Sequence, residues 1–294
     1  MIRFRLFATT ALAAAALVGI AHAGASEAVD LTVTPQWLAA HLNDPDLVVL
    51  HVGDNYSRKH IAGAREVSLD DIAVDSGGLS LQLPAPGDLK ARLEKLGISD
   101  GSRIVIYSSD RDVSPATRVL FTLYAAGLGD RVSLLDGTLA KWAGPVSDKT
   151  PAAKIGHLLD LHMQPVVVDQ AFVKAHMTAP GYDIVDARAR VFYDGIQPGG
   201  PMMHMKLGHI PGALSVPFTS FNNDDQTLKS PAQARAIFAD AGVKAGDHLI
   251  VYCHIGQQAT EVLFAAREAG IYAVLYDGSF EDWAIHDQPV TRGK

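Results

Sequence analysis

The chain has 294 residues, enough for about two domains of ordinary size. Hydrophobic residues make up 48% of it and charged residues 19%, so each half can bury a core and wholesale disorder is excluded. With 25 Lys and Arg against 32 Asp and Glu, the formal charge is −7, which argues against nucleic acid as a partner.

Residues 1–23 predict a secretion signal, which would make the mature protein periplasmic or secreted. Arg3 and Arg5 give a short basic end, residues 6–20 are apolar, and Ala21 and Ala23 are small residues where a signal peptidase cleaves. The apolar run is shorter than the roughly 20 residues that span a bilayer. We therefore expect no membrane attachment after removal of the signal.

The elements that follow alternate between strand and helix. Thr34 and Asp169 are helix N-cap types, and glycines at 127 and 270 are placed to end later helices. Short apolar runs rich in Val and Ile predict buried strands at residues 47–52, 104–107, 132–135, 182–185, 249–252 and 273–276. This alternation predicts an α/β fold, with a mainly parallel sheet and helices on both faces.

The chain contains two copies of one repeated unit. Five segments match in order: residues 34–41 with 169–176, 60–64 with 209–213, 104–107 with 249–252, 116–121 with 259–264, and 136–142 with 277–283. Such ordered self-similarity indicates a duplicated domain. We place the first domain at residues 29–145, a Pro-containing linker at 146–160 and the second domain at 161–294.

Cys253 is the only cysteine, so an intramolecular disulfide and a Cys-rich zinc site are both excluded. It follows a predicted strand and lies just before a helix, where backbone amides and the helix dipole favour an anion. Gly256 tolerates the positive φ that lets such a loop close. We predict that Cys253 is a nucleophilic thiolate; the alternative is a buried, inert cysteine.

The first copy lacks this chemistry. Ser108 takes the place of the cysteine, and a serine hydroxyl needs an adjacent general base to act as a nucleophile. The loop after it holds no histidine, and Asp110 and Asp112 disfavour an anion. We predict that the first domain is catalytically inactive.

The second copy carries a 14-residue insertion between Asp186 and His209, at the carboxyl end of a predicted strand, where ligands bind in open α/β sheets. Arg188 at this strand end would hold an anion, or else lie solvated on the surface. The insertion contains a run of residues with soft ligand atoms, Met202, Met203, His204 and Met205. This run would either line the substrate crevice or bind Cu(I), and the sequence leaves both open.

Together these motifs resemble the rhodanese family of tandem-domain sulfurtransferases over about residues 29–290. The motifs are Asp186-Ala187-Arg188, the run at 208–213, Tyr252-Cys253 with its six-residue loop, and Asp277-Gly278 followed by Trp283. The resemblance implies two tandem rhodanese-like domains, with a persulfide-forming Cys253 in the second. It also implies that Arg188 binds a small anionic sulfur donor and that no metal or organic cofactor is needed. The amides implied to cradle the sulfur are those of His254, Ile255, Gly256, Gln257, Gln258 and Ala259.

The loop departs from the patterns of both major groups in the family. Enzymes that prefer thiosulfate commonly have Arg-Lys after the cysteine, and those that prefer 3-mercaptopyruvate have Gly-Ser, whereas this chain has His254-Ile255. Tyr193 lies near the place of the family's second arginine, unless Arg190 substitutes for it. We expect thiosulfate as donor and a thiol, dithiol or cyanide as acceptor. His254 would be partly protonated and assist the anionic donor, or else be an exposed loop histidine without such a role. The alternatives are 3-mercaptopyruvate as donor, or a persulfide carrier without turnover.

A rival enzyme class shares this topology. Cysteine phosphatases and arsenate reductases place an arginine six residues after the cysteine, where it clamps the dianion. That position is Ala259 here, and the loop has no basic residue except His254. The sequence therefore argues against phosphatase chemistry.

Overall fold

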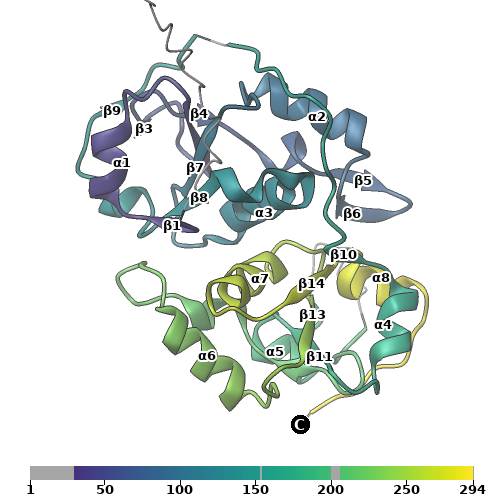
Figure 1. Ribbon diagram of the computed structural model, residues 1–294. Coiled ribbons are helices and arrows are strands. Elements are labelled where there is room, and N and C mark those ends of the chain that lie inside the picture. The colour runs from purple at the N-terminus through teal and green to yellow at the C-terminus, as the bar shows by residue number, and fades with distance from the viewer. Residues whose placement is uncertain (1–29, 153, 200–205, 294) are drawn as a thin grey trace, which may run out of the picture.

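The computed structural model describes residues 30–152, 154–199 and 206–293. The predicted signal and Met202–Met205 lie outside these ranges. Within them, no helix is long and apolar enough to cross a membrane. The chain forms two α/β domains, drawn in purple to teal and in green to yellow in Figure 1.

The first domain is built on a parallel five-stranded sheet of order β1-β8-β7-β2-β4. Its strands are β1 (Thr32–Val33), β2 (Leu47–Val52), β4 (Arg65–Glu66), β7 (Arg103–Ser108) and β8 (Val132–Leu135). Its helices are α1 (Pro35–His41), α2 (Pro86–Lys95) and α3 (Ser114–Leu123). Two small antiparallel pairs join β3 (His60–Ile61) to β9 (Val146–Ser147), and β5 (Val74–Ser76) to β6 (Leu79–Gln82).

The second domain repeats this order as β10-β14-β13-β11-β12. Its strands are β10 (Val167–Val168), β11 (Tyr182–Asp186), β12 (Leu214–Ser215), β13 (His248–Tyr252) and β14 (Ala273–Tyr276). Its helices are α4 (Gln170–His176), α5 (Arg190–Tyr193), α6 (Pro231–Asp240), α7 (Ala259–Glu268) and α8 (Ser279–Ile285). The shared order confirms the predicted fold class.

The residue types explain why each sheet is covered on both faces. Side chains alternate along a strand, so Leu50 of β2 packs with α2 and α3 on one face while Val49 packs with α1 on the other. In the second domain, Val251 faces α6 and α7, and Ile250 faces α4 and α8. Strands buried on both faces need continuous apolar runs, which the sequence has.

The helix ends follow the predicted capping. Thr34 Oγ1 accepts a hydrogen bond from the Trp37 amide at 3.1 Å, and Asp169 Oδ1 accepts one from the Phe172 amide at 2.8 Å. Gly270, with φ +73°, lies just past α7 as expected. The helical turn that follows α3 breaks at Gly127, whose left-handed φ of +87° ends the helix there, also as expected.

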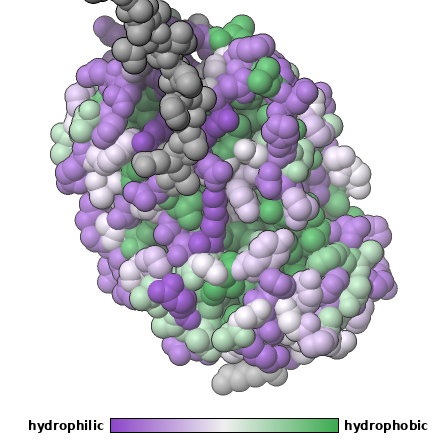
Figure 2. All heavy atoms as spheres, in the orientation of Figure 1, coloured by the Kyte–Doolittle hydropathy of each residue, from purple (hydrophilic) through white to green (hydrophobic). Residues whose placement is uncertain are grey.

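The two domains meet along α3 and α7, which lie next to each other at the boundary in Figure 1. The hydroxyls of Thr117 and Thr260 share a hydrogen bond of 2.9 Å across this boundary. Phe264 of α7 belongs to the apolar core of the first domain. Figure 2 shows polar side chains over most of one face, with apolar ones visible near its middle.

The predicted linker, 146–160, begins with β9, which pairs with β3 of the first domain. Beyond it, the linker lies along α2: the Gly156 amide donates to the Glu94 carbonyl at 2.7 Å, and the Leu158 amide donates to the Glu94 carboxylate at 2.9 Å. It then runs down to β10 at the edge of the second sheet (Figure 1).

Candidate active site

Cys253 follows β13 directly and is 1% exposed. Its amide donates to Ser279 Oγ at 3.2 Å, and its carbonyl accepts a hydrogen bond from the Phe280 amide at 3.0 Å. Ser279 Oγ in turn donates to the Tyr276 carbonyl at 2.9 Å. The turn between β14 and α8 therefore fixes the backbone of the cysteine on one side.

The loop after Cys253 leads into the N-terminus of α7. Within the described ranges, the amides of residues 254–259 donate to no protein acceptor. The Gln257 carbonyl, by contrast, accepts from Thr260 Oγ1 at 2.6 Å, which fixes the end of the loop. Ile255 and Gln258 are partly buried, and Ala259 is fully buried as the first residue of α7. Unpaired amides at a helix N-terminus favour a bound anion.

An arginine of the first domain reaches this loop. Arg118 of α3 is fully buried, and its Nη1 donates to the Gly256 carbonyl at 3.1 Å and to Asp277 Oδ1 at 2.6 Å. Its Nη2 donates to the Leu81 carbonyl. Gly256 has φ +83°, and a Cβ there would lie 2.9 Å from Asp277 oxygens and 3.0 Å from Arg118 Nη1. The close approach explains why glycine is required.

Other contacts join the cysteine loop, and the adjacent turn and helix after β14, to the first domain. Gln257 Nε2 donates to Ser114 Oγ at 3.0 Å, and the Leu83 amide donates to Asp277 Oδ2 at 2.8 Å. The amide and hydroxyl of Ser80, on β6, both donate to the Glu281 carboxylate of α8. The first domain thus supports the cysteine loop although it carries no cysteine of its own.

The sequence predicted that the Arg188 side chain would be free to hold an anion, whereas the structure shows it buried and paired. It is 1% exposed, and its Nε and Nη2 donate to the Asp186 carboxylate at 2.6–3.1 Å. Nη2 also donates to the Gly208 carbonyl at 2.7 Å, and the guanidinium lies 4.0 Å from the centre of the Phe280 ring. Although burial disfavours the charge, Asp186 holds the pKa of Arg188 above its usual value. Its charge is therefore largely balanced within the protein.

His254 also differs from the expectation of partial protonation. Burial, assisted by the positive charge of Arg188, lowers the pKa of His254 to about 4. The ring is 7% exposed and packs edge-on against Phe192 at 4.8 Å. Its Nδ1 has no partner among the described residues, and a Cβ on Gly199 would lie 2.1 Å from the ring. His254 is therefore neutral near pH 7 and enclosed by apolar neighbours.

Neither Tyr193, at the expected place of a second arginine, nor its possible substitute Arg190 has a described contact with the cysteine loop. Tyr193 stacks on His209 at 3.7 Å and donates to the Ala213 carbonyl at 2.7 Å, which is a structural role. Arg190 pairs with Asp194 at a half-exposed position. From the same segment, Phe192 packs against His254 of the loop, a contact that the sequence did not predict.

Arg118 and Asp277 were also not predicted as site residues. The repeat contains a signal for one of them, because residues 116–121 and 259–264 align Arg118 with Glu261. A charged residue at the same position of two mainly apolar segments indicates a paired, buried polar group. Both side chains are indeed buried: Arg118 donates to Gly256 and Asp277, and Glu261 accepts from Asn222.

In the first domain, Ser108 occupies the place of the cysteine. It is 3% exposed, and its Oγ donates to the carbonyls of Asp110 and Asp112 at 3.1 and 3.0 Å. Its hydroxyl hydrogen is therefore engaged by the loop itself. Among the described residues, no group of three or more His, Cys, Asp and Glu side chains is arranged to hold a metal ion.

Comparison with known proteins agrees with this geometry. The rhodanese-like domain family matches residues 34–145 and 169–286. A probable 3-mercaptopyruvate sulfurtransferase from Pseudomonas aeruginosa is 32% identical, covering 89% of this chain and 98% of that protein. A thiosulfate sulfurtransferase from Rattus norvegicus is 27% identical, covering 88% and 94%.

A solved structure shows the same architecture. The crystal structure of SseA from Escherichia coli, described as a 3-mercaptopyruvate sulfotransferase, is 25% identical and superposes with a TM-score of 0.76. The match covers 85% of this chain and 99% of that one. The chain therefore belongs to the rhodanese family of sulfurtransferases and carries two rhodanese-like domains in tandem.

Proposed function

We propose that this protein transfers sulfane sulfur from a small donor to a thiophilic acceptor through a persulfide on Cys253. The observation that carries the proposal is the position of Cys253, at the end of β13 and before a loop with six unpaired amides within the described ranges. These amides, with the N-terminus of α7, favour an ionised sulfur and a persulfide anion at this point.

The reaction proceeds in two displacements. The Cys253 thiolate attacks the sulfur that the donor gives up, a sulfur–sulfur bond forms, and the bond from that sulfur to the rest of the donor breaks. The rest of the donor leaves with the bonding electrons, as sulfite from thiosulfate or as the enolate of pyruvate from 3-mercaptopyruvate, and the enolate then takes up a proton. An acceptor thiolate, or cyanide in an assay, then attacks the outer sulfur of the persulfide and releases the thiolate. Stabilising the negative charge on the cysteine sulfur assists both steps.

The charges around the loop support a donor of the 3-mercaptopyruvate class over thiosulfate. Arg188 and Arg118 are each balanced by an aspartate, and His254 is neutral near pH 7. A dianion such as thiosulfate would find little net positive charge around the loop. Its binding is therefore disfavoured more than the binding of a monoanion. The relative from P. aeruginosa, named for 3-mercaptopyruvate, is also consistent with this choice.

The experiment is to compare steady-state sulfur transfer to cyanide and to a dithiol from 3-mercaptopyruvate and from thiosulfate. We expect a higher kcat/KM with 3-mercaptopyruvate. A higher value with thiosulfate would overturn the donor assignment but not the persulfide chemistry. Persulfide formation without turnover on any acceptor would favour the carrier alternative.

Export remains a prediction from residues 1–23. We propose a periplasmic or secreted location, which is tested by fractionating cells that express the full chain and sequencing the N-terminus of the product. Cleavage after Ala23 is the expected result.

A further inference from the structure

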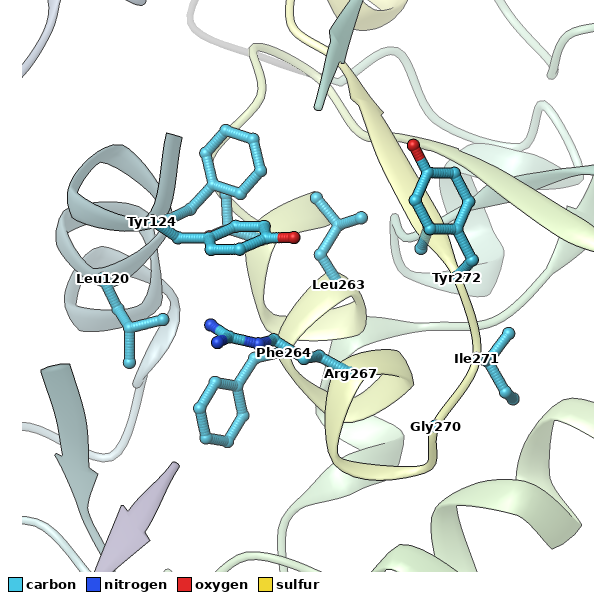
Figure 3. A pocket seen from close by; sticks show the side chains of 11 residues that line it. Leu120, Tyr124, Leu263, Phe264, Arg267, Gly270, Ile271 and Tyr272 are labelled. Carbon is cyan, nitrogen blue, oxygen red and sulfur yellow. The ribbon is translucent and has the colours of Figure 1, made fainter. Parts of the chain in front are cut away.

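A cavity lies between the domains, and its lining includes neither Cys253 nor the loop that follows it. It has a volume of about 300 Å³ and opens between α3 with the turn that follows it on one side, and α7 with the start of β14 on the other (Figure 3). This volume is at the lower end of the range of small-molecule sites, which often occur at domain interfaces. It fits a compound of one or two rings.

The walls of this cavity are mainly apolar and aromatic. Leu120 and Tyr124 come from the first domain, and Leu263, Phe264 and Tyr272 come from the second, as Figure 3 shows. Tyr124 begins the turn that follows α3, and this turn is kinked at Gly127, whose φ is +87°. Rings on opposite walls favour a flat, aromatic ligand.

One charged side chain crosses the cavity. Arg267 of α7 extends toward α3, and its guanidinium lies 4.3 Å from the centre of the Tyr124 ring (Figure 3). No carboxylate forms an ion pair with it within the described ranges, since neighbouring Glu268 binds Thr32 Oγ1 at 3.0 Å instead. Its Nη1 is buried without a described partner, and its Nη2 makes a long bond of 3.3 Å to the Gly129 carbonyl.

Arg267 is partly buried as a residue, and it contrasts with the two fully buried arginines. Arg118 and Arg188 each have an aspartate within 2.6 Å, whereas Arg267 faces an apolar cavity without one. A buried donor that lacks an acceptor is costly, and an anionic ligand would supply the missing partner.

We propose that this interdomain cavity binds a small aromatic carboxylate, with the carboxylate held by Arg267 and the ring packed between Tyr124 and Leu263. The proposal does not depend on the sulfur chemistry at Cys253. Because the cavity is shared by both domains, its ligand would stabilise the docked arrangement and raise the melting temperature.

The test is calorimetric titration of the full-length protein with 1-naphthoate and, separately, with uncharged 1-naphthylmethanol. We expect saturable binding of 1-naphthoate with a Kd on the order of 0.1 mM and weaker binding of the alcohol. Arg267→Met should weaken 1-naphthoate binding at least tenfold and leave the alcohol little changed. Leu263→Trp, which fills the cavity, should abolish binding of both.

Arg292→Met is the matched control, because Arg292 is exposed and also donates to a backbone carbonyl, that of Leu207. It should bind like the wild type. The proposal is overturned if the wild type shows no saturable binding, if folded Arg267→Met retains full affinity, or if binding survives Leu263→Trp. Should Arg267→Met fail to fold, the Leu263→Trp result and the preference for acid over alcohol decide the matter.

Discussion

Arg118 of the first domain and Asp277 of the second form an ion pair of 2.6 Å with the guanidinium fully buried. The same guanidinium nitrogen supports the Gly256 carbonyl in the cysteine loop. The domain without a cysteine is thereby a structural part of the cysteine loop in the other domain. The tandem arrangement therefore contributes directly to the construction of this loop.

Replacing Arg118 tests this relationship. Arg118→Met leaves Asp277 buried and unpaired, which we expect to cost about 3–5 kcal/mol of unfolding free energy. Denaturant unfolding measures this loss, and sulfur transfer should fall as well. The control is Lys141→Met, because Lys141 pairs with Asp225 across the same boundary but at an exposed site, worth less than about 1 kcal/mol. Equal effects of the two substitutions would contradict the assigned role.

Gly256 provides a steric test of the loop. Gly256→Ala adds a Cβ that meets Asp277 and Arg118, in a left-handed conformation that L-residues disfavour. We expect a loss of about 2–4 kcal/mol and a clear drop in persulfide formation. Gly181→Ala is the control, since Gly181 has φ +84° but nothing within 4 Å of its added Cβ. It should cost only about 1 kcal/mol; similar losses at both sites would show that the close approach is not the cause.

His254 should not control the rate between pH 5.5 and 8. Burial lowers its pKa to about 4, so the ring is already neutral throughout this window. The pH profile of persulfide formation should therefore be the same in His254→Gln as in the wild type. His286→Gln, at an exposed site, is the control and should also leave the profile unchanged. A titration step near pH 6.5 that disappears in His254→Gln alone would refute the assignment.

Glu261 makes stability fall as pH rises. Burial raises the pKa of this carboxyl to about 8, and one of its oxygens has no partner among the described residues. The folded protein then holds a proton that the unfolded chain releases above its ordinary value of 4.5. Between about pH 4.5 and 8, the unfolding free energy should fall by at most about 1.4 kcal/mol per pH unit, and then level off.

Glu261→Gln removes this titration. Chemical unfolding at pH 5 and pH 8 should show a variant whose stability, relative to the wild type, is greater at pH 8 than at pH 5. Glu66→Gln, at an exposed position, should not change the pH dependence. If Glu261→Gln and the wild type respond to pH alike, the carboxyl is not held neutral by burial.

The fold was largely predictable from the sequence. Apolar runs such as 47–52 and 132–135 are strands with those bounds, because a strand buried on both faces must be apolar along its length. The two copies also reinforce each other, so that Thr34 and Asp169 cap equivalent helices. Gly127 ends the helical segment that follows α3 with a left-handed φ of +87°, as its residue type predicts.

The candidate site was less predictable, because its electrostatics depend on contacts between residues far apart in the chain. Sequence motifs located Cys253 and Arg188, but not the fact that Asp186 balances Arg188. The neutral state of His254 follows from the packing of Phe192 and Gly199 around it, which no local pattern reveals. Arg118 lies 138 residues from the loop that it supports.

The central claim is that Cys253 carries the transferred sulfur, and mass spectrometry tests it most directly. The protein is exposed in turn to 3-mercaptopyruvate and to thiosulfate, and digested without reductant. We predict one added sulfur on the peptide that contains Cys253, no addition in Cys253→Ser, and normal addition in Ser108→Ala. Sulfur transfer that persists in Cys253→Ser, or a wild-type Cys253 that stays unmodified with every donor, would contradict the account.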